Sequence, residues 1–542
     1  MRFALFCLGD RAYGPQFCVA GRKLAARLVQ LGASPWCQVG YGDDGSPNGG
    51  VFGDLDKWLE ESFLPILPLR ERIQRFEIIS PYSVKVVDRE GPSIFAEHYD
   101  TFRSRGCPMT AYSYLDGTRV QNSTLATRIP LQGIVVSNDR ITDLAWNQDT
   151  RHISIQVDAI NDATGPFLAG DILSVVPSNS KDEVDKFLQV LPKSIQSLAD
   201  STIEVCYDTH LTIQWPQLCT IRELLTQCAD IQALPEREDL RVLSSLCTDS
   251  EQSSKLLSLS ETSGAALYTD YILREKRTWA DVLYDFDAVT MNVETLLFLL
   301  PPMRPRQFSI ASAPASIVDL CVAVVEGTTP LGRSYTGLCS TYLRDLDVDE
   351  KVHVWISPGS FGRLPLMPSP RQDRFETPII FIGAGTGIAP LRGLIQERER
   401  VRISMSDSTN HDETTIPGEA PDNTLVFGCR KERMDFYYND EWSTLVEASK
   451  LSLYTAFSQD QWHKIYVQQT IRDNGVGRGT LIIDHILERN GAVFIAGSAK
   501  MARAIRDEII ECLGKVLGGT KEALAVLKAM QRKGIFAVEA WS

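Results

Sequence analysis

Residues 306–312, with the sequence RQFSIAS, combine side chains that could bind a flat, phosphorylated molecule. The alternation in this stretch predicts a strand, on which Arg306 and Phe308 share one face. Gln307 and Ser309 then share the opposite face. Arginine suits a phosphate, an aromatic ring can lie against a flat ligand, and a hydroxyl can hydrogen-bond at its edge. A core strand with one surface arginine would show the same residues, so this interpretation depends on what accompanies the stretch.

A glycine-rich turn at residues 383–387, GAGTG, could hold a pyrophosphate. It follows an apolar predicted strand and precedes a predicted helix with Pro390 in its first turn, ending near Glu399. Glycines let the backbone approach a pyrophosphate, and the N-terminus of a helix favours its negative charge. The strand before and the helix after distinguish this turn from an ordinary glycine loop.

The loop at residues 456–469, AFSQDQWHKIYVQQ, could hold a phosphate monoester. Ser458 supplies a hydroxyl and Lys464 an ammonium group, a pairing that suits such a phosphate. A charged surface loop is the alternative interpretation. The penultimate residue, Trp541, also suggests a function, because chain ends usually fray and rarely contribute to a core.

In this order, residues 306–312, the stretch GRSYTGLCSTYL at 332–343, the glycine turn and the terminal tryptophan resemble the ferredoxin-reductase-type FAD and NADPH module of the diflavin reductase family. The resemblance implies FAD contacts from Arg277, Arg306, Gln307, Phe308, Ser309, Gly337, Leu338, Cys339 and Ser340. It implies NADPH contacts from Thr386, Ser458, Gln459, Lys464, Ile465, Tyr466, Val467, Gln468 and Trp541. The family usually has an arginine after the loop serine, whereas this chain has Gln459, so we expect a weaker preference for NADPH over NADH.

The resemblance also implies catalytic contacts. Ser309 would hydrogen-bond near the flavin N5, and Glu539 would lie beside the nicotinamide. Trp541 would cover the flavin ring and move aside for the nicotinamide. Such contacts position the hydride donor, while the flavin supplies the chemistry.

Ala496 stands where the microsomal cytochrome reductases carry a cysteine. Together with the runs RPRQFSIAS, GLCSTYL and AGSAK, it makes the chain similar to the NADPH-dependent diflavin oxidoreductase branch of the family. That branch donates electrons to the iron–sulfur protein anamorsin in cytosolic iron–sulfur cluster assembly, so the resemblance implies a partner of that type. Two alternatives remain: a single-flavin NADPH reductase acting directly on a protein acceptor, and a non-catalytic partner-binding relative.

The sequence predicts an α/β and β-barrel multidomain fold, whose elements would position these residues. Residues 129–375 alternate like the antiparallel strands of an FAD-binding barrel, interrupted at about 181–300 by a helical insertion that resembles the family's connecting domain. Residues 376–542 contain short apolar runs between helical stretches, which predict a parallel NADP-binding sheet. Residues 69–128, with mixed charge and Gly-Pro pairs, predict a linker with some local order.

The apolar runs give the positions of these elements. The barrel strands are predicted from residue 131 and at 151–157, 167–176, 307–311, 320–326 and 352–356, and the parallel strands at 379–382, 424–427, 451–457 and 492–495. The helices of the insertion are predicted at 182–191, 221–233, 240–247, 251–257 and 280–286.

Residues 1–68 predict a strand–helix–strand–helix order, as in half of a doubly wound sheet. The runs LGDRAY, RKLAARLVQLGA and GYGDD resemble the later part of an FMN-binding flavodoxin domain, although a generic strand–helix unit is the alternative. The resemblance implies that Leu8, Tyr13, Phe17 and Asp44 line the flavin, with Tyr13 stacked on it. The phosphate-binding turn of that fold would precede Met1, so we expect this segment to bind FMN weakly or not at all, and we expect a longer natural chain.

Composition narrows the class of protein. With 542 residues and a net charge of −14, the chain should form about three domains and should not bind nucleic acid. Its 12 cysteines form no C-x-x-C pair, which argues against a metal site and for a reducing, cytoplasmic compartment. No run approaches the roughly 18 apolar residues that a membrane crossing needs. The sequence leaves the acceptor and the oligomeric state open.

Overall fold

The computed structural model describes residues 2–11, 17–46, 50–66, 80–87, 112–115, 118–121, 131–157, 167–207, 213, 215–361, 377–409, 422–473 and 479–541. The chain divides into two compact units. One comprises Met1–Phe102, Asn179–Met303 and Gly327–Tyr335, and the other Arg103–Ser178, Arg304–Glu326 and Thr336–Ser542. No helix in the described part of the chain is both long enough and apolar enough to cross a membrane.

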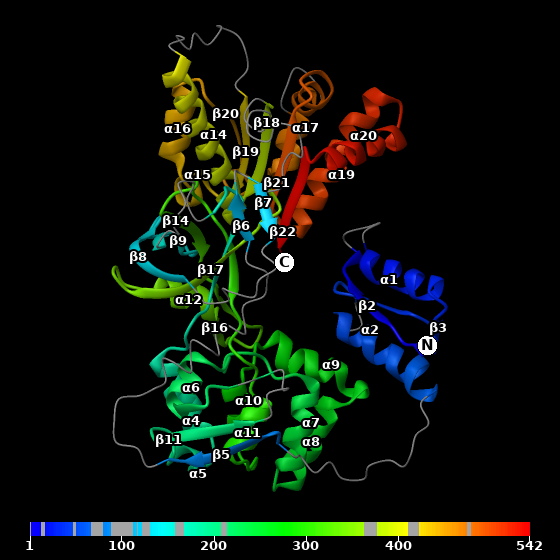
Figure 1. Cartoon of the computed structure of the whole chain (residues 1–542), viewed down its shortest axis with the longest axis vertical. Coiled ribbons are helices and arrows are strands. Elements are labelled where there is room, and N and C mark those ends of the chain that lie inside the picture. Colours follow the sequence, from blue (N-terminus) through cyan, green and yellow to red (C-terminus); the bar gives the residue numbers. More distant parts are fainter. Residues whose placement is uncertain are drawn as a thin grey trace. The chain divides into compact units, whose positions relative to one another are not determined.

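The second unit contains a five-stranded parallel sheet (Figure 1). Its order is β20 (Ser452–Phe457), β19 (Asn423–Cys429), β18 (Ile379–Ala384), β21 (Ala492–Ser498) and β22 (Phe536–Trp541). The first four strands confirm the predicted apolar runs. The fifth strand was not predicted, because it is short and of mixed polarity and becomes a strand only by pairing with β21.

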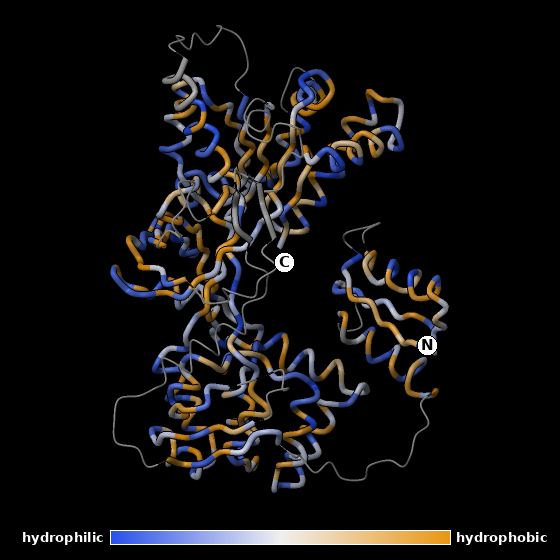
Figure 2. Tube along the Cα trace, viewed as in Figure 1, coloured by the Kyte–Doolittle hydropathy of each residue, from blue (hydrophilic) through white to orange (hydrophobic). Residues whose placement is uncertain are grey.

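Alternating side chains bury both faces of this sheet. Phe381 and Phe494 pack into a core on one face with helices α14 (Ile388–Thr409) and α16 (Asn439–Glu447). Ile382 and Ile495 point to the other face, where α17 (Val467–Asp473), α19 (Ala499–Leu517) and α20 (Thr520–Lys533) cover them. Figure 1 shows the two groups of helices on opposite sides of the strands, and Figure 2 shows both polar and apolar residues along each helix. This two-sided burial is why the strands read as continuous apolar runs.

Helix α14 is longer than predicted. Its predicted end lay near Glu399, but the helix continues to Thr409. Residues 400–409 contain no glycine or proline, so nothing in them forces the helix to stop.

The same unit contains a six-stranded antiparallel sheet that carries the RQFS motif. Its order is β13 (Arg306–Ser309), β10 (Ile172–Val175), β17 (Lys351–Ser357), β8 (Leu131–Arg140), β9 (Thr150–Val157) and β14 (Ile317–Ala323). Beyond the end of β13, Ile310 forms a bridge with Leu320 of β14, so the two edge strands approach each other there. Closure into a barrel stays a prediction.

Helix α12 (Leu338–Arg344) packs against this sheet, with Leu343 in the same core as Val352 and Val354. The side chain of Asn138 on β8 donates to three carbonyl groups at the end of α12, those of Leu343, Arg344 and Leu346, at 2.8–3.1 Å. The helix that carries residues 338–340 is therefore fixed at both its face and its C-terminal end.

The first unit is mainly helical, as predicted for the insertion. Its helices include α4 (Lys181–Val190), α6 (Ile221–Gln227), α7 (Arg237–Leu246), α8 (Ser250–Ser260), α10 (Trp279–Asp285) and α11 (Val293–Leu299), which share one core. It also holds an antiparallel sheet that was not predicted, with the order β12 (Leu218–Thr220), β11 (Thr202–Tyr207) and β5 (Tyr82–Val86). Strand β5 lies within the stretch 69–128 that was predicted as a linker, so part of that stretch belongs to a sheet.

The N-terminal segment has the predicted strand–helix order. Strand β2 (Phe6–Gly9) pairs in parallel with β4 (Gly40–Asp43), and helices α1 (Val19–Gln30) and α2 (Gly50–Trp58) follow them in the chain. Its small buried core consists of Cys7, Phe17 and Cys18.

Candidate functional site

A pocket of about 590 Å³ lies at the carboxyl ends of the parallel strands. This edge is where ligands bind in open parallel sheets, and the volume falls within the usual range for ligand sites. The structure places a large part of the predicted nucleotide set in its lining, namely Thr386, Ser458, Ile465, Tyr466, Val467, Gln468 and Trp541. It does not place Gln459 or Lys464 there, and both are exposed.

The predicted glycine turn forms the floor of this pocket. Gly385 has a φ of +55°, a conformation that favours glycine, and it lines the pocket together with Thr386. A Cβ on Gly387 would lie 2.2 Å from the carbonyl oxygen of Ala496, so only glycine lets strand β21 pass this close. The turn leads into the N-terminus of α14, where backbone N–H groups lack intrahelical acceptors. The local structure therefore has the features of a pyrophosphate site.

Strand β22 carries two of the predicted catalytic residues. Glu539 and Trp541 are two positions apart on the strand, so their side chains point to the same face. Trp541, 37% exposed, lines the pocket. The hydroxyl of Ser309, at the end of β13, donates to Oε1 of Glu539 at 2.5 Å. The structure thus brings Ser309, Glu539 and Trp541 together from distant parts of the sequence.

The Glu539 carboxyl is poised to interact with a further group. Its Oε2 atom is buried and has no hydrogen-bond partner among the residues that the structure describes. Burial raises the pKa of Glu539, while the hydrogen bond from Ser309 and the backbone N–H of Ser360 oppose that rise. A buried, unpaired oxygen of this kind needs an explanation, and a bound ligand supplies one.

The predicted FAD residues of this unit also lie close together. Arg306 on β13 is near enough to helix α12 to act on Cys339: burial raises the pKa of that thiol to about 12, and the charge of Arg306 opposes the rise. Phe308 packs partly into the sheet core, and Gln307 is exposed. Arg306 and the first turn of α12 therefore place a cation beside N–H groups that lack intrahelical acceptors.

The backbone at Gly337, just before the first turn of α12, packs closely against Val325. A Cβ on Gly337 would lie 2.7 Å from the Cβ of Val325, so the backbone there needs glycine. The N–H of Gly337 donates to the carbonyl of Val325, and the hydroxyl of Ser340 accepts from the N–H of the same residue. These two hydrogen bonds hold the turn in place, and the predicted FAD contacts of Leu338 and Cys339 stay a prediction.

Arg277 lies in the other unit, where it lines a separate pocket of about 640 Å³. It pairs with Asp285, and its guanidinium lies 4.4 Å from the ring centre of Tyr271. Its predicted FAD contact stays a prediction.

The predicted FMN residues are only partly described. Leu8 is 67% exposed and Asp44 is exposed, whereas Phe17 is buried with Arg11 and Arg22 over its ring. Tyr13 lies outside the described residues.

Several residues that line the nucleotide pocket were missed by the sequence analysis. They include Gln148, Arg430, Asp435, Tyr437, Lys500 and Met501. Arg430 follows β19 and Lys500 follows β21, so the rule that ligands bind at the carboxyl ends of parallel strands could have pointed to them. Gln148 gives no such signal, because it reaches the pocket from the loop between β8 and β9.

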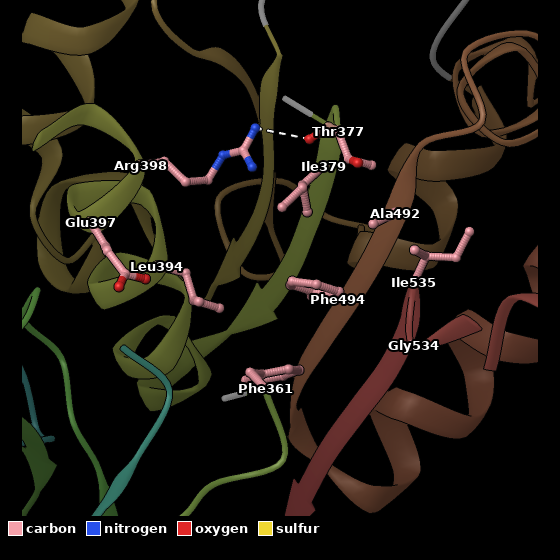
Figure 3. A pocket seen from close by; sticks show the side chains of 10 residues that line it. All are labelled: Phe361, Thr377, Ile379, Leu394, Glu397, Arg398, Ala492, Phe494, Gly534 and Ile535. Atoms are coloured by element: carbon pink, nitrogen blue, oxygen red, sulfur yellow. Dashed lines mark hydrogen bonds between the residues drawn. The ribbon is translucent and has the colours of Figure 1, made fainter. Parts of the chain in front are cut away.

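A second cavity lies at the amino ends of the same strands (Figure 3). It measures about 20 Å³ and is lined mainly by apolar side chains, including Phe361, Ile379 and Phe494. Arg398 at its rim is occupied, because it donates to Asn423 at 2.6 Å and to the carbonyl of Thr377 at 2.9 Å. This volume holds about one water molecule, so the cavity is no candidate for a substrate or cofactor site.

Comparison with known protein families agrees with this geometry. Residues 130–342 match the FAD binding domain family, residues 381–507 match the oxidoreductase NAD-binding domain family, and residues 1–58 match the flavodoxin family. These matches cover the RQFS motif, the glycine turn and the N-terminal segment respectively.

Individual relatives match the chain along almost its whole length. NADPH-dependent diflavin oxidoreductase 1 from Danio rerio is 33% identical over 99% of this chain and 84% of its own length. The protein of the same name from Mus musculus is 33% identical over 100% of this chain and 85% of its own length, and that from Schizosaccharomyces pombe is 28% identical with the same coverage. The chain therefore belongs to the NADPH-dependent diflavin oxidoreductase family, whose flavodoxin, FAD-binding and NAD(P)-binding domains use FMN, FAD and NADPH to transfer electrons from NADPH to flavin.

Proposed function

We propose that this chain transfers a hydride from NADPH to FAD at the Ser309–Glu539 pair. Where the flavodoxin domain is complete, we propose that electrons then pass through FMN to an iron–sulfur protein of the anamorsin type. The observation that carries the first step is the position of β22. This strand joins Glu539, hydrogen-bonded to Ser309 of the FAD-binding sheet, to Trp541 in the wall of the nucleotide pocket.

The described residues fit FAD. Arg306 supplies a cation beside the first turn of α12, and the ring of Phe308 lies on the same strand. The buried Oε2 of Glu539 offers an unpaired polar atom next to Ser309. We assign the pyrophosphate of FAD to Arg306 and the turn at Gly337, and its ring system to the region of Phe308 and Ser309.

The nucleotide pocket fits NADPH. The glycine turn and the N-terminus of α14 suit the pyrophosphate, and Ser458 with Tyr466 suits the adenosine end. Trp541 lines the same pocket and lies two residues from Glu539 on β22. Reducing equivalents reach the protein as the hydride of bound NADPH, and FAD is the group that converts this two-electron donor into a source of single electrons.

The chain's own residues contribute positioning and electrostatics. Glu539, as a carboxylate, stabilises the positive charge that the nicotinamide acquires when it gives up a hydride. Ser309 fixes the orientation of that carboxylate through its hydrogen bond. Trp541 would cover the ring of a bound flavin and keep water away from it.

We further propose that electron transfer serves cytosolic iron–sulfur cluster assembly. Membership of the family supports the acceptor, and the cysteines support the compartment, because all eleven that lie among the described residues are free thiols. The net charge of −14 disfavours a nucleic-acid partner, and no apolar run in the sequence approaches the length that a membrane crossing needs. We therefore propose neither a nucleic acid nor a membrane as a partner.

The test uses the purified full chain loaded with FAD. We expect NADPH to bleach the flavin absorbance under anaerobic conditions, and we expect ferricyanide to be reduced in turnover. This chain alone should fail to reduce an oxidised iron–sulfur protein of the anamorsin type, because we expect its flavodoxin segment to bind FMN weakly or not at all. A chain with a complete, FMN-loaded flavodoxin domain should reduce the cluster, detected by electron paramagnetic resonance. Failure of that complete chain to reduce the cluster, with ferricyanide reduction retained, would refute the proposed acceptor while leaving the FAD step intact.

A further inference from the structure

Asp171 is a fully buried acidic residue that the proposed reaction leaves without a role. It immediately precedes β10, the strand that pairs with β13 on one side and with β17 on the other. In both pairings the next residue, Ile172, is a register partner, opposite Ser309 of β13 and opposite Ser357 of β17. Asp171 therefore lies between the strand that carries Ser309 and the strand that leads to Ser360.

Hydrogen bonds from both neighbouring segments converge on Asp171. The N–H of Ile310, which follows Ser309, donates to the backbone carbonyl of Asp171 at 2.9 Å. The N–H of Gly359, which precedes Ser360, donates to Oδ1 of the Asp171 side chain at 3.2 Å. One residue thus fixes the backbone beside each of the two groups, the hydroxyl of Ser309 and the N–H of Ser360, that favour the ionised carboxylate of the proposed reaction.

The turn before Asp171 and the segment at Gly359 pack backbone against backbone. A Cβ on Gly359 would lie 1.7 Å from the carbonyl oxygen of Gly170, so no larger residue fits there without a shift of the chain. The N–H of Leu168 donates to Oδ2 of Asp171 at 2.9 Å. Both side-chain oxygens of Asp171 therefore accept from backbone N–H groups, and the residue is anchored on two sides.

The charge of Asp171 also acts on Glu539. Burial raises the pKa of Glu539, and the negative charge of Asp171 raises this pKa further, since a like charge disfavours ionisation of its neighbour. Ser309 and the backbone N–H of Ser360 lower the same pKa. Among the described residues, Asp171 is the charged group with this effect, and it comes from a different segment than either opposing group.

We propose that Asp171 is a positioning residue for hydride transfer, because it holds the segments of Ser309 and Ser360 in place around the Glu539 carboxyl. The inference rests on the proposed hydride transfer at the Ser309–Glu539 pair. Asp171 acts through these residues rather than on the nicotinamide or the flavin. Its charge also determines how far the pH must rise before Glu539 ionises, which gives the role a readout that packing alone would not change.

The experiment replaces Asp171 by asparagine in the full, FAD-loaded chain. Asparagine keeps one oxygen that can accept from Gly359, and it leaves the backbone carbonyl in place, so the main loss is the negative charge. Protonation of Glu539 is followed across pH by the infrared absorption of its protonated carboxyl group, with Glu539→Gln as the blank in each background. The rate of flavin reduction by NADPH is followed by anaerobic stopped flow over the same pH range.

The matched control is Asp319→Asn, which neutralises another acidic residue of the same antiparallel sheet. Asp319 lies on β14, where its carboxylate accepts from the hydroxyl of Ser154 at 2.8 Å and pairs with Arg392 at 3.1 Å. Its charge is not among the causes that shift the pKa of Glu539 within the described part of the chain. Asp319→Asn should therefore leave both pH midpoints at their wild-type values.

We expect Asp171→Asn to move both midpoints to lower pH by about 1 unit, because Glu539 then ionises without a neighbouring negative charge. The rate rises as Glu539 ionises, so the rate profile moves in the same direction as the pKa. The rate at high pH should fall by about 2- to 10-fold, because the amide lacks the second oxygen that accepts from Leu168. Unmoved midpoints in Asp171→Asn, or an equal movement in Asp319→Asn, would overturn the inference.

A second variant, Ser360→Pro, decides the matter if Asp171→Asn does not fold. Ser360 is exposed, and proline removes the N–H that Asp171 holds in place through Gly359. Both midpoints should then move to higher pH, and no upward movement would refute the inference. Wild-type protein without any pH-dependent rise would refute the proposed role of Glu539 itself, whereas a wild-type rise with an unmoved Asp171→Asn profile refutes this inference alone.

Discussion

Replacement of Ser309 by alanine should slow the reduction of FAD by NADPH and move its pH dependence. Ser309 donates to Oε1 of Glu539 at 2.5 Å. A hydrogen bond to a buried group that can be charged is worth about 1–3 kcal/mol. If the bond persists in the transition state, its loss slows hydride transfer by about 5- to 150-fold.

The direction of the pH effect follows from the causes that set the pKa of Glu539. Burial raises this pKa, and the hydrogen bond from Ser309 lowers it. The ionised carboxylate is the form that stabilises the cationic nicotinamide, so the rate should rise as pH increases through the pKa of Glu539. Ser309→Ala removes one of the opposing causes, which moves the pKa further upward and the rate profile to higher pH.

The assay is anaerobic stopped-flow measurement of flavin bleaching across a range of pH values. Glu539→Gln keeps the shape of the side chain but cannot ionise, so it should be slow and lack the pH-dependent rise. The two variants must retain bound FAD and wild-type melting temperatures for the comparison to hold. A Ser309→Ala profile that moves to lower pH, or a Glu539→Gln profile with the wild-type rise, would refute this account of the pair.

Three further changes test the supporting structure. Gly387→Ala places a Cβ 2.2 Å from the carbonyl oxygen of Ala496. We expect this clash to lower the free energy of unfolding by about 1–3 kcal/mol in chemical denaturation, and to weaken NADPH binding measured by calorimetry. Wild-type values in both measurements would contradict the close approach of the two segments. His485 is buried, and burial lowers its pKa from 6.5 to about 4. The unfolded chain therefore binds the proton first, and the free energy of unfolding should fall by about 3 kcal/mol between pH 6.5 and pH 4, a loss that His485→Gln should remove. Asn138→Ala leaves three carbonyl groups at the end of α12 without their donor, which should lower the free energy of unfolding by about 1–3 kcal/mol. FAD should also be released faster, as measured by fluorescence of the freed flavin. Unchanged release would show that α12 does not depend on this contact.

The elements that bury both faces were predictable from the sequence. Strands β18, β19 and β21 read as apolar runs because helices cover both sides of the sheet, and the glycine turn after β18 follows from its place between a strand and a helix. Strands β5 and β22 were missed for a physical reason. Each is short and of mixed polarity, and each becomes a strand only by pairing with a partner far away in the sequence.

The candidate site was predictable where local motifs carry the chemistry. Ser309, Ser458 and Trp541 were found because their motifs occur in an order that a known family shares. The structure joins Ser309 to Glu539 and places Ser458 and Trp541 in the lining of one pocket. Arg430 lines the pocket but was missed, because no local pattern reveals its contacts with Trp146 and Asp435. Lys464 lies in the predicted loop, but its side chain is exposed and does not line the pocket, so its contact with the nucleotide stays a prediction.

We propose that Ser309 and Glu539 join an FAD site to a nucleotide pocket closely enough for hydride transfer. The most direct test is to load the purified chain with FAD, confirm by chromatography that the flavin is bound in equal amount to protein, and add NADPH without oxygen. We expect rapid loss of the flavin absorbance together with oxidation of an equal amount of NADPH. Protein that holds FAD firmly but leaves both absorbances unchanged would contradict it.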